Sequence, residues 1–416
     1  MNTDGLAPNK TGITTTTTKS IGWKHLSFFI FFCLQIPFWW LLVEHDVTRA
    51  MTARAKFNAP VLGSDINENT DYFQNYPDIT PESGQFMKRP LFLPLFLATN
   101  WILSQTGLEY PERMYAYLSI IASACGLMMA ILLLKCGWNP LQAITGAVLS
   151  IFSFSWMSTF TIPETYSLTV LAVILCLISA ERLASGGKLS WFRHATIVGL
   201  ASWLYPPICG ASLLVASLAK ERKQWLTIVL PAVLIAAMIA VAPQFFSERG
   251  GVDKQLSYLA KYGSFENFGS IDHWRDVATI FAFFSFVSPV QDFVTANGRP
   301  DWGYILSNEI LLTTVLAIAA VHLFLLQQIV TSNFRREWIG VGAWLFCLFL
   351  FFVLFNPREI LLYASIPATL LLYCAGRALG QRWRNSHWKN HKALTVLLAV
   401  TAVLLLCINV RSVLGL

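Results

Sequence analysis

The sequence predicts an all-α polytopic membrane protein, and its composition, apolar runs and charge distribution support this fold class. Hydrophobic residues make up 55% of the 416 residues and charged residues only 13%, whereas about 25% of the residues of a soluble globular protein are charged. The apolar residues gather in runs of about 20 residues, the length that a helix needs to cross a bilayer. Lys and Arg gather in alternate loops between these runs, as the positive-inside rule requires. The net charge of +7 therefore reflects orientation in a membrane, and no nucleic-acid partner is predicted.

The first elements are a polar tail and a span. Residues 1–20 are polar and are expected to form a flexible cytoplasmic tail. The first span is predicted over residues 23–43. Lys19 and Lys24 flank its start and Glu44 follows its end, which predicts a cytoplasmic N-terminus. No small-residue cleavage site follows this run, so a cleaved signal peptide is not expected.

A long polar segment over residues 44–113 follows and is predicted to form the first outward loop. Near its end, residues 91–103 form an apolar run that is too short for a span. Pro90 precedes this run and Pro94 interrupts it. We expect an interfacial helix here, lying in the outer leaflet. Counting this run as a span would invert every later loop and destroy the charge asymmetry.

The later apolar runs predict the remaining spans of a single transmembrane domain over residues 21–416. Together with the first run they predict about eleven transmembrane helices. The short runs on either side of Tyr205-Pro206-Pro207 are compatible with two spans or with one kinked hairpin. The later runs cover residues 114–134, 140–160, 164–181, 192–206, 207–219, 225–243, 304–328, 339–355, 359–376 and 393–411.

This topology places two kinds of polar segment on opposite sides of the membrane. The loops assigned to the cytoplasm are rich in cations such as Arg182 and Arg377, and Glu181 is one of their few acids. A second outward segment is predicted over residues 244–303. Its apolar stretch at residues 276–292 carries two aspartates and a proline, which favours a surface or re-entrant piece over a span.

Several polar residues are predicted to meet on the outer side. They are Glu164 and Tyr166 at the start of one span, Tyr205, and the adjacent pair Arg358 and Glu359. A charge at the bilayer centre costs about 2.5–3.5 kcal/mol, so these charges are expected at the interface or in a water-filled cavity. For Glu164 a functional role and an ordinary role at the start of a helix are equally compatible with the sequence. Proline at the first helical position and an acid in the first turn are both common at helix N-termini.

Two cations and three acids of the first outer loop are further candidates. Lys88 and Arg89 precede the apolar run at residues 91–103, where they act either as snorkelling cations or as a clamp for a lipid phosphate. Most of the loop acids are expected to be solvated. Asp65, which follows a Gly-Ser pair, is the first candidate for a general base. Asp71 is the second candidate and Asp46 the third.

These motifs together resemble a known family. The outer-loop acids are followed by Lys88-Arg89-Pro90-Leu91-Phe92 and then by Pro163-Glu164-Thr165-Tyr166-Ser167-Leu168. This order is similar to the GT-C superfamily of polyprenyl-phosphate-sugar-dependent glycosyltransferases. The closest branch contains protein O-mannosyltransferases and bacterial enzymes that modify lipid A or the O-antigen of lipopolysaccharide. The resemblance covers about residues 20–210 and is loose afterwards.

The chain departs from the family pattern at two motifs. The Asp-Glu pair that often follows the first span is here Glu44-His45-Asp46, and Lys88-Arg89 stands where His is more common. The identity of the base therefore stays open among Asp65, Asp71 and Asp46.

The resemblance implies an inverting transfer of a sugar from a polyprenyl-phosphate donor to a glycan, lipid or protein acceptor. The expected location is the extracytoplasmic face of a bacterial inner membrane, where membrane lipids are further partners. In such a reaction a carboxylate takes the proton of the acceptor hydroxyl while cations hold the departing phosphate. The resemblance gives the first role to Asp65, Asp71 or Asp46, the second to Lys88, Arg89 and Arg358, and other substrate contacts to Glu164, Tyr166, Tyr205 and Glu359.

No cofactor is required by the sequence. The eight cysteines form no CxxC pair and no Cys/His cluster, so neither a zinc site nor a disulfide framework is predicted. Acids are abundant, which makes a divalent metal compatible with the reaction, but no ligand spacing calls for one.

The alternatives to an enzyme are a transporter or flippase for a lipid-linked or anionic solute, and a membrane scaffold. Transporters commonly show internal repeats and polar residues at the midplane of the membrane. The sequence shows no repeat, and its charges gather at one face. A scaffold would not need acids and cations at one interface, so the enzyme is favoured.

Overall fold

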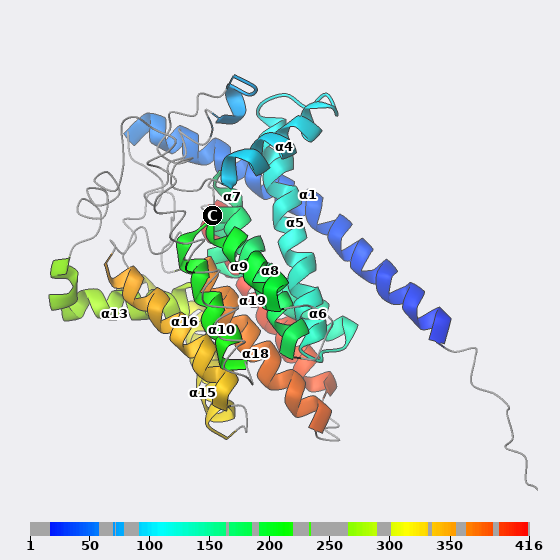
Figure 1. Ribbon diagram of the computed structural model, residues 1–416. Helices are drawn as coiled ribbons and strands as arrows, with labels where there is room; N and C mark the ends of the chain where they lie inside the picture. Colours follow the sequence, from blue (N-terminus) through cyan, green and yellow to red (C-terminus); the bar gives the residue numbers. More distant parts are fainter. Residues whose placement is uncertain are drawn as a thin grey trace, which may run out of the picture.

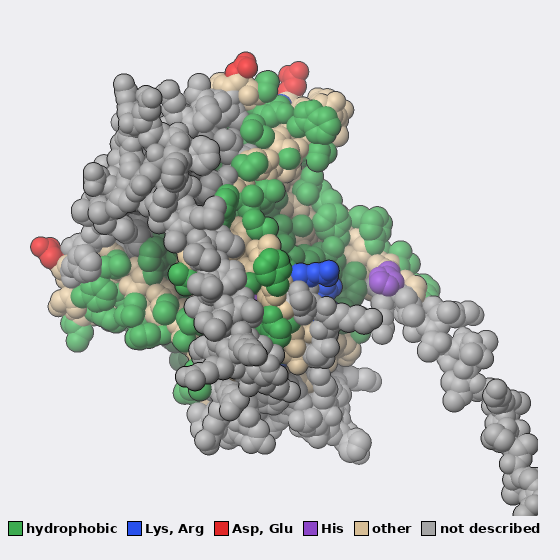
Figure 2. All heavy atoms as spheres, in the orientation of Figure 1, with side chains coloured by type: hydrophobic (Ala, Val, Ile, Leu, Met, Phe, Trp, Pro, Cys, Tyr) green, Lys and Arg blue, Asp and Glu red, His purple; other side chains and the backbone are tan. Residues whose placement is uncertain are grey.

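The computed structural model is a bundle of helices, and no strand occurs among the residues that it describes (Figure 1). Hydrophobic side chains cover most of the described surface in Figure 2, as expected for a protein surrounded by lipid. The structure describes residues 17–57, 70, 72–78, 91–163, 166–184, 191–218, 233, 265–288, 301–331, 335–354, 363–385 and 391–414.

The elements fall into two groups. One group comprises α4 (Phe92–Ser104), η2 (Pro206–Gly210), η3 (Phe265–Gly269), α13 (Ile271–Thr279), the π-helix η4 (Ile280–Phe284) and α14 (Trp302–Ser307). The helices of the bundle are α1 (Thr17–Phe57), α5 (Glu112–Lys135), α6 (Pro140–Ile151), α7 (Phe154–Thr161), α8 (Tyr166–Ala184), α9 (Trp191–Ser202), α10 (Ala211–Leu218), α15 (Glu309–Thr331), α16 (Arg335–Val353), α18 (Ser365–Asn385) and α19 (His391–Leu414).

Within the described residues, four helices are long and apolar enough to cross a membrane. The pair α6 and α7, bent by 66° at its break, is a fifth candidate if it forms one span. The predicted membrane protein is therefore supported. Other predicted spans appear as shorter helices, for example α9 and α10, and residues 225–243 lie outside the described part of the chain except for residue 233. The four helices are His25–Arg49, Glu112–Lys135, Tyr166–Ala184 and Thr395–Leu414.

Helix α1 does not end where the first span was predicted to end. It continues past Val43 to Phe57 and contains 41 residues, so the start of the predicted outer loop is helical. The polar part, from Glu44 onward, is rich in Ala, Arg, Met and Lys, which are strong helix formers. The first acid of the loop therefore marks a change from apolar to polar sequence and not the end of a helix.

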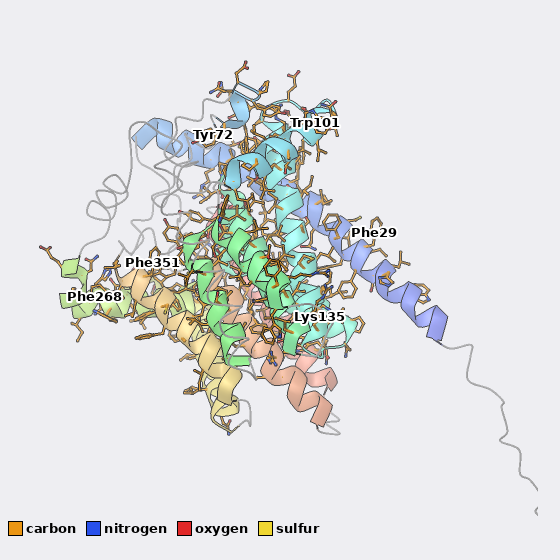
Figure 3. All side chains as sticks on the ribbon, in the orientation of Figure 1. Phe29, Tyr72, Trp101, Lys135, Phe268 and Phe351 are labelled. Carbon is orange, nitrogen blue, oxygen red and sulfur yellow. The ribbon has the colours of Figure 1, made fainter. Side chains whose placement is uncertain are left out.

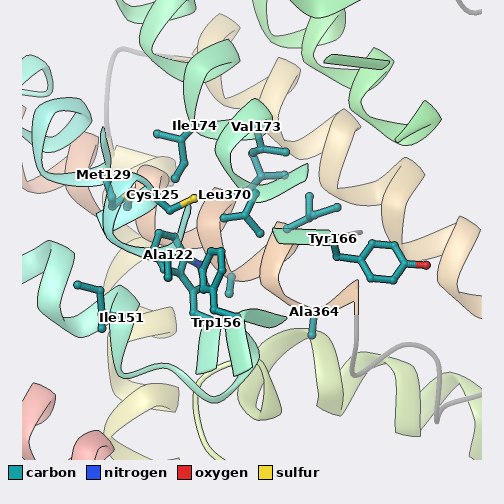
Figure 4. Packing of buried hydrophobic residues seen from close by; sticks show 14 of the residues in the cluster. Ala122, Cys125, Met129, Ile151, Trp156, Tyr166, Val173, Ile174, Ala364 and Leu370 are labelled. Carbon is teal, nitrogen blue, oxygen red and sulfur yellow. The ribbon is translucent and has the colours of Figure 1, made fainter. Parts of the chain in front are cut away.

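Close packing between helices depends on small residues. At Gly126 of α5, an added Cβ atom would collide with the side chain of Gln35 of α1, so glycine lets the two helices approach. Behind this contact lies the buried core shown in Figure 4, where Trp156 of α7 and Ala122 and Cys125 of α5 pack together. The indole nitrogen of Trp156 donates to Thr369 Oγ1 of α18 at 3.0 Å, which ties α7 to α18.

Asn409 of α19 joins three segments that are far apart in the sequence. Its side chain is fully buried. The Nδ2 atom donates to the carbonyls of Phe152 and Phe286, each at 2.7 Å, and Oδ1 accepts from the amide of Ser288 at 2.9 Å. Asn409 therefore ties the break between α6 and α7 to the turn that follows η4. The described part of the predicted surface or re-entrant piece, residues 276–288, thus packs on the bundle, and residues 289–292 are outside the described structure.

Glu181 and Arg377, which the sequence interpretation placed in cytoplasmic loops, form a buried ion pair between α8 and α18. Their side chains are only 8% and 9% exposed. The hydroxyl of Tyr373 donates to Glu181 Oε1 at 2.6 Å, and Arg377 Nη1 donates to the Tyr373 oxygen at 3.0 Å. The loop assignment was wrong because opposite charges that neutralise one another can be buried within helices.

Reporter fusions can test the predicted orientation of the helices in the membrane. Visible acidic side chains lie at the end of the bundle near α4 and on α13 in Figure 2, whereas Lys135 lies toward the opposite end in Figure 3. Fusions after Arg113 and Thr161 should report the outside, and a fusion after Arg384 should report the cytoplasm. A cytoplasmic signal after Arg113 would contradict this orientation and would show that residues 91–103 cross the membrane.

Candidate functional site

Among the residues predicted to form a site, the structure describes Asp46, Tyr166 and Tyr205. Their surroundings are therefore known, whereas the roles of the others stay predictions. The others, outside the described residues, are Asp65, Asp71, Lys88, Arg89, Glu164, Arg358 and Glu359.

Asp46 is buried in the C-terminal part of α1. Its exposed fraction is 1%, whereas its neighbours Glu44 and His45 are exposed. Val43 and Val47, which are buried too, show that this face of the helix points into the protein. Aspartate is almost never fully buried without a specific reason. Burial therefore distinguishes Asp46, the third candidate on sequence, as a carboxylate held inside the protein.

The C-terminal part of α1 is fixed to the end of α19. Arg49, one turn after Asp46, donates from Nη1 to the carbonyl of Val413 at 2.5 Å. A cation at the C-terminal end of a helix is also favoured by the helix dipole. This contact holds the polar part of α1 against the bundle and so helps to position Asp46.

Tyr166 and Tyr205 belong to one aromatic cluster with Tyr363, a residue that the sequence reasoning missed. The hydroxyl of Tyr166 donates to that of Tyr363 at 2.7 Å. The rings of Tyr205 and Tyr363 stack at 5.8 Å between centroids, and those of Tyr166 and Tyr205 meet edge-on at 6.1 Å. Tyr166 and Tyr363 are the first described residues after the segments that hold Glu164 and the Arg358-Glu359 pair. The sequence signal that could have identified Tyr363 is its position shortly after the Arg358-Glu359 pair.

Arg113 is a second residue that the sequence reasoning missed. It lies in the first turn of α5, is 8% exposed, and donates from Nη2 to the carbonyl of Phe73 at 2.6 Å. Its guanidinium also lies over the ring of Tyr76, 4.9 Å from the ring centroid. No carboxylate among the described residues pairs with it. Arg113 is thus a buried cation that ties a segment of the outer loop to the bundle.

A small hollow lies beside this segment. It has room for about one water molecule and is bounded by residues of the predicted outer loop, α4 and α5 and by the second residue after α7. Tyr72 lies at the same end of the molecule as Trp101 of α4 (Figure 3). The hydroxyl of Tyr117, which is 2% exposed, makes no hydrogen bond in the described structure. The lining residues are Tyr72, Phe73, Phe92, Phe96, Tyr117, Leu118 and Pro163.

Helix α4 forms where the interfacial helix was predicted, with 13 residues. Phe92, Phe96 and Asn100 lie on its buried side, whereas Leu95 and Trp101 are exposed. The spacing of four residues between the buried side chains places them on one helix face. A length of about 20 Å is too short for a span. Phe92 and Phe96 on the buried side of α4 line the aromatic hollow.

The described candidate residues offer groups for acid–base chemistry and for anion binding. Asp46 supplies a carboxylate, Arg113 a cation, and the tyrosines supply hydroxyls that can bind polar ligands. No group of three or more His, Cys, Asp or Glu side chains placed to hold a metal ion occurs within the described ranges. No protein-family model matches the sequence, and no curated protein matches it either. The resemblance to the GT-C superfamily therefore rests on the sequence motifs alone.

Proposed function

We propose that this protein is a membrane glycosyltransferase that moves a sugar from a polyprenyl-phosphate donor to an acceptor on the extracytoplasmic face. The observation that carries the proposal is the burial of Asp46 in the C-terminal part of α1. It gives one of the three predicted base candidates a position inside the protein. The tyrosine cluster and Arg113 add polar groups toward the outer end of the same bundle.

The proposed reaction is a single displacement at the anomeric carbon of the donor. The acceptor oxygen forms a bond to this carbon while the bond to the phosphate oxygen breaks. The proton of the acceptor hydroxyl passes to a carboxylate, for which Asp46, Asp65 and Asp71 are the candidates. The released group is polyprenyl phosphate, whose developing charge Lys88, Arg89 and Arg358 would stabilise.

The proposal also includes the number of membrane spans and their orientation. We infer about eleven spans in one domain over residues 21–416, with the N-terminus in the cytoplasm of a bacterial cell. The spans that the described helices support are fewer, and the additional ones rest on the apolar runs of the sequence. The tyrosine cluster supports this arrangement because it joins the start of α8, the segment just before α18 and the residue before η2, near the predicted outer ends of these spans.

A transfer assay with purified protein tests the function. The protein in lipid nanodiscs is mixed with short-chain polyprenyl-phosphate sugars and an extract of envelope glycolipids, and mass spectrometry follows both products. We expect polyprenyl phosphate and a sugar-bearing acceptor to appear together, and neither without the protein. Intact donor that crosses the membrane of proteoliposomes without being consumed would instead identify a transporter or flippase and would overturn the proposal.

A further inference from the structure

The strongest unexplained feature of the described structure is the buried charge of Arg113. Taking a guanidinium out of water is costly unless an opposite charge and hydrogen bonds compensate it. The carbonyl of Phe73 and the ring of Tyr76 supply part of this compensation. The Nε atom is buried and has no hydrogen-bond partner, and no carboxylate in the described part of the chain pairs with the guanidinium. Within the described residues, no anion therefore balances the charge of Arg113.

Tyr117 adds a second unsatisfied donor on the same side of α5. Residues that are four positions apart lie on one helix face, and Arg113 and Tyr117 have this spacing. Phe73 connects them, because its carbonyl accepts from Arg113 and its ring lies 5.2 Å from the ring of Tyr117. Tyr117 lines the aromatic hollow, and its hydroxyl has no hydrogen-bond partner. Two buried donor atoms without hydrogen-bond partners, Arg113 Nε and the Tyr117 hydroxyl, thus belong to residues that contact Phe73.

We propose that Arg113 and Tyr117 bind the phosphate group of a lipid in the outer leaflet. The guanidinium fork matches the oxygens of a phosphate, and the tyrosine hydroxyl can donate to another oxygen. Arg113 lies in the first turn of a predicted span, the depth at which lipid headgroups contact basic residues. The aromatic side chains of Phe73, Phe92 and Phe96 supply apolar surface beside the hydroxyl. The proposal does not require the protein to transfer a sugar.

The test uses two variants that separate ligand binding from packing. Tyr117→Phe keeps the ring that packs on Phe73 and Phe96 and removes only the hydroxyl, which bonds to nothing in the described structure. Arg113→Gln keeps a donor for the Phe73 carbonyl and removes the charge. Arg275→Gln is the matched control, because this arginine lies on α13 with a side chain that is 58% exposed.

Binding is measured by native mass spectrometry of the full chain with three probes: phosphatidylglycerol, a short-chain polyprenyl phosphate and the matching polyprenol without phosphate. We expect affinity for a phosphate-bearing lipid to fall about tenfold in Tyr117→Phe, because the variant loses a hydrogen bond to a charged group. The affinity should fall further in Arg113→Gln, which also loses the positive charge. The Arg275→Gln control and polyprenol binding should not change. Loss for phosphatidylglycerol identifies a bilayer lipid as the ligand, and loss for polyprenyl phosphate alone identifies a lipid carrier.

Wild-type affinity for both phosphate lipids in Tyr117→Phe and Arg113→Gln would overturn the proposal. An equal loss for polyprenol would overturn it as well, because the variants would then have changed packing and not phosphate binding. If Arg113→Gln does not fold, Tyr117→Phe decides alone, since its packing is conserved. The assay contains no acceptor, so a protein that binds phosphate lipid but fails the transfer assay would refute the proposed function and leave this site in place.

Discussion

Replacement of Arg377 by methionine is expected to lower the free energy of unfolding by about 3–5 kcal/mol. The substitution leaves the carboxylate of Glu181 buried without its cation, and the Tyr373 hydroxyl alone cannot neutralise it. Thermal unfolding of the purified protein in detergent, followed by loss of helical signal, measures the effect.

Two further variants of this protein serve as a control for the substitution and as a rescue of the lost stability. Arg275 also pairs with acids, Asp272 and Asp276, but its side chain is 58% exposed, so Arg275→Met should cost less than about 1 kcal/mol. The double variant Glu181→Leu with Arg377→Met should regain most of the lost stability, because the unpaired charge is then gone. Equal losses of unfolding free energy in Arg377→Met and Arg275→Met would show that burial does not increase the contribution of the Glu181–Arg377 pair to stability.

Substitution Asp46→Asn is expected to reduce transfer turnover by about two to four orders of magnitude. Asparagine keeps the shape of the side chain and its hydrogen-bonding capacity but cannot take a proton from the acceptor. Donor binding, measured separately with the same preparation, should be retained, since the carboxylate acts on the acceptor hydroxyl.

The comparison variants are Asp65→Asn and Asp71→Asn, which test the candidates ranked above Asp46 on sequence. Asp272→Asn is a control for the substitution itself, because the Asp272 side chain is 75% exposed on α13. Turnover near the wild-type value in Asp46→Asn would exclude it as the base. The role would then belong to whichever of the other two variants is inactive.

The membrane character and several helices could be predicted from the sequence because they depend on local composition. The predicted spans at residues 23–43, 114–134, 164–181 and 393–411 lie on α1, α5, α8 and α19, each of which is long and apolar enough to cross a bilayer. Hydropathy detects such elements since a lipid environment demands a continuous apolar stretch.

The features that the sequence did not reveal depend on contacts between distant residues. Arg113 bonds to a carbonyl 40 positions earlier, and Glu181 pairs with a residue 196 positions later. A charge pattern along one chain assigns each charge to a loop, because it carries no information about a partner on another helix. Tyr166 and Tyr205 were predicted to lie near one another, and their rings do meet. Tyr363, which contacts both, was missed for the same reason.

The continuity of α1 makes helical register the quantity that positions Asp46. Each residue of an α-helix advances the chain by about 1.5 Å and turns it by about 100°. One residue inserted between Trp40 and Asp46 would therefore rotate the carboxylate off the buried face, while Gln35 kept its contact with Gly126. The packing of α1 on α5 at Gln35 and Gly126 thus sets both the position of the Asp46 carboxylate along the helix axis and its rotation about that axis.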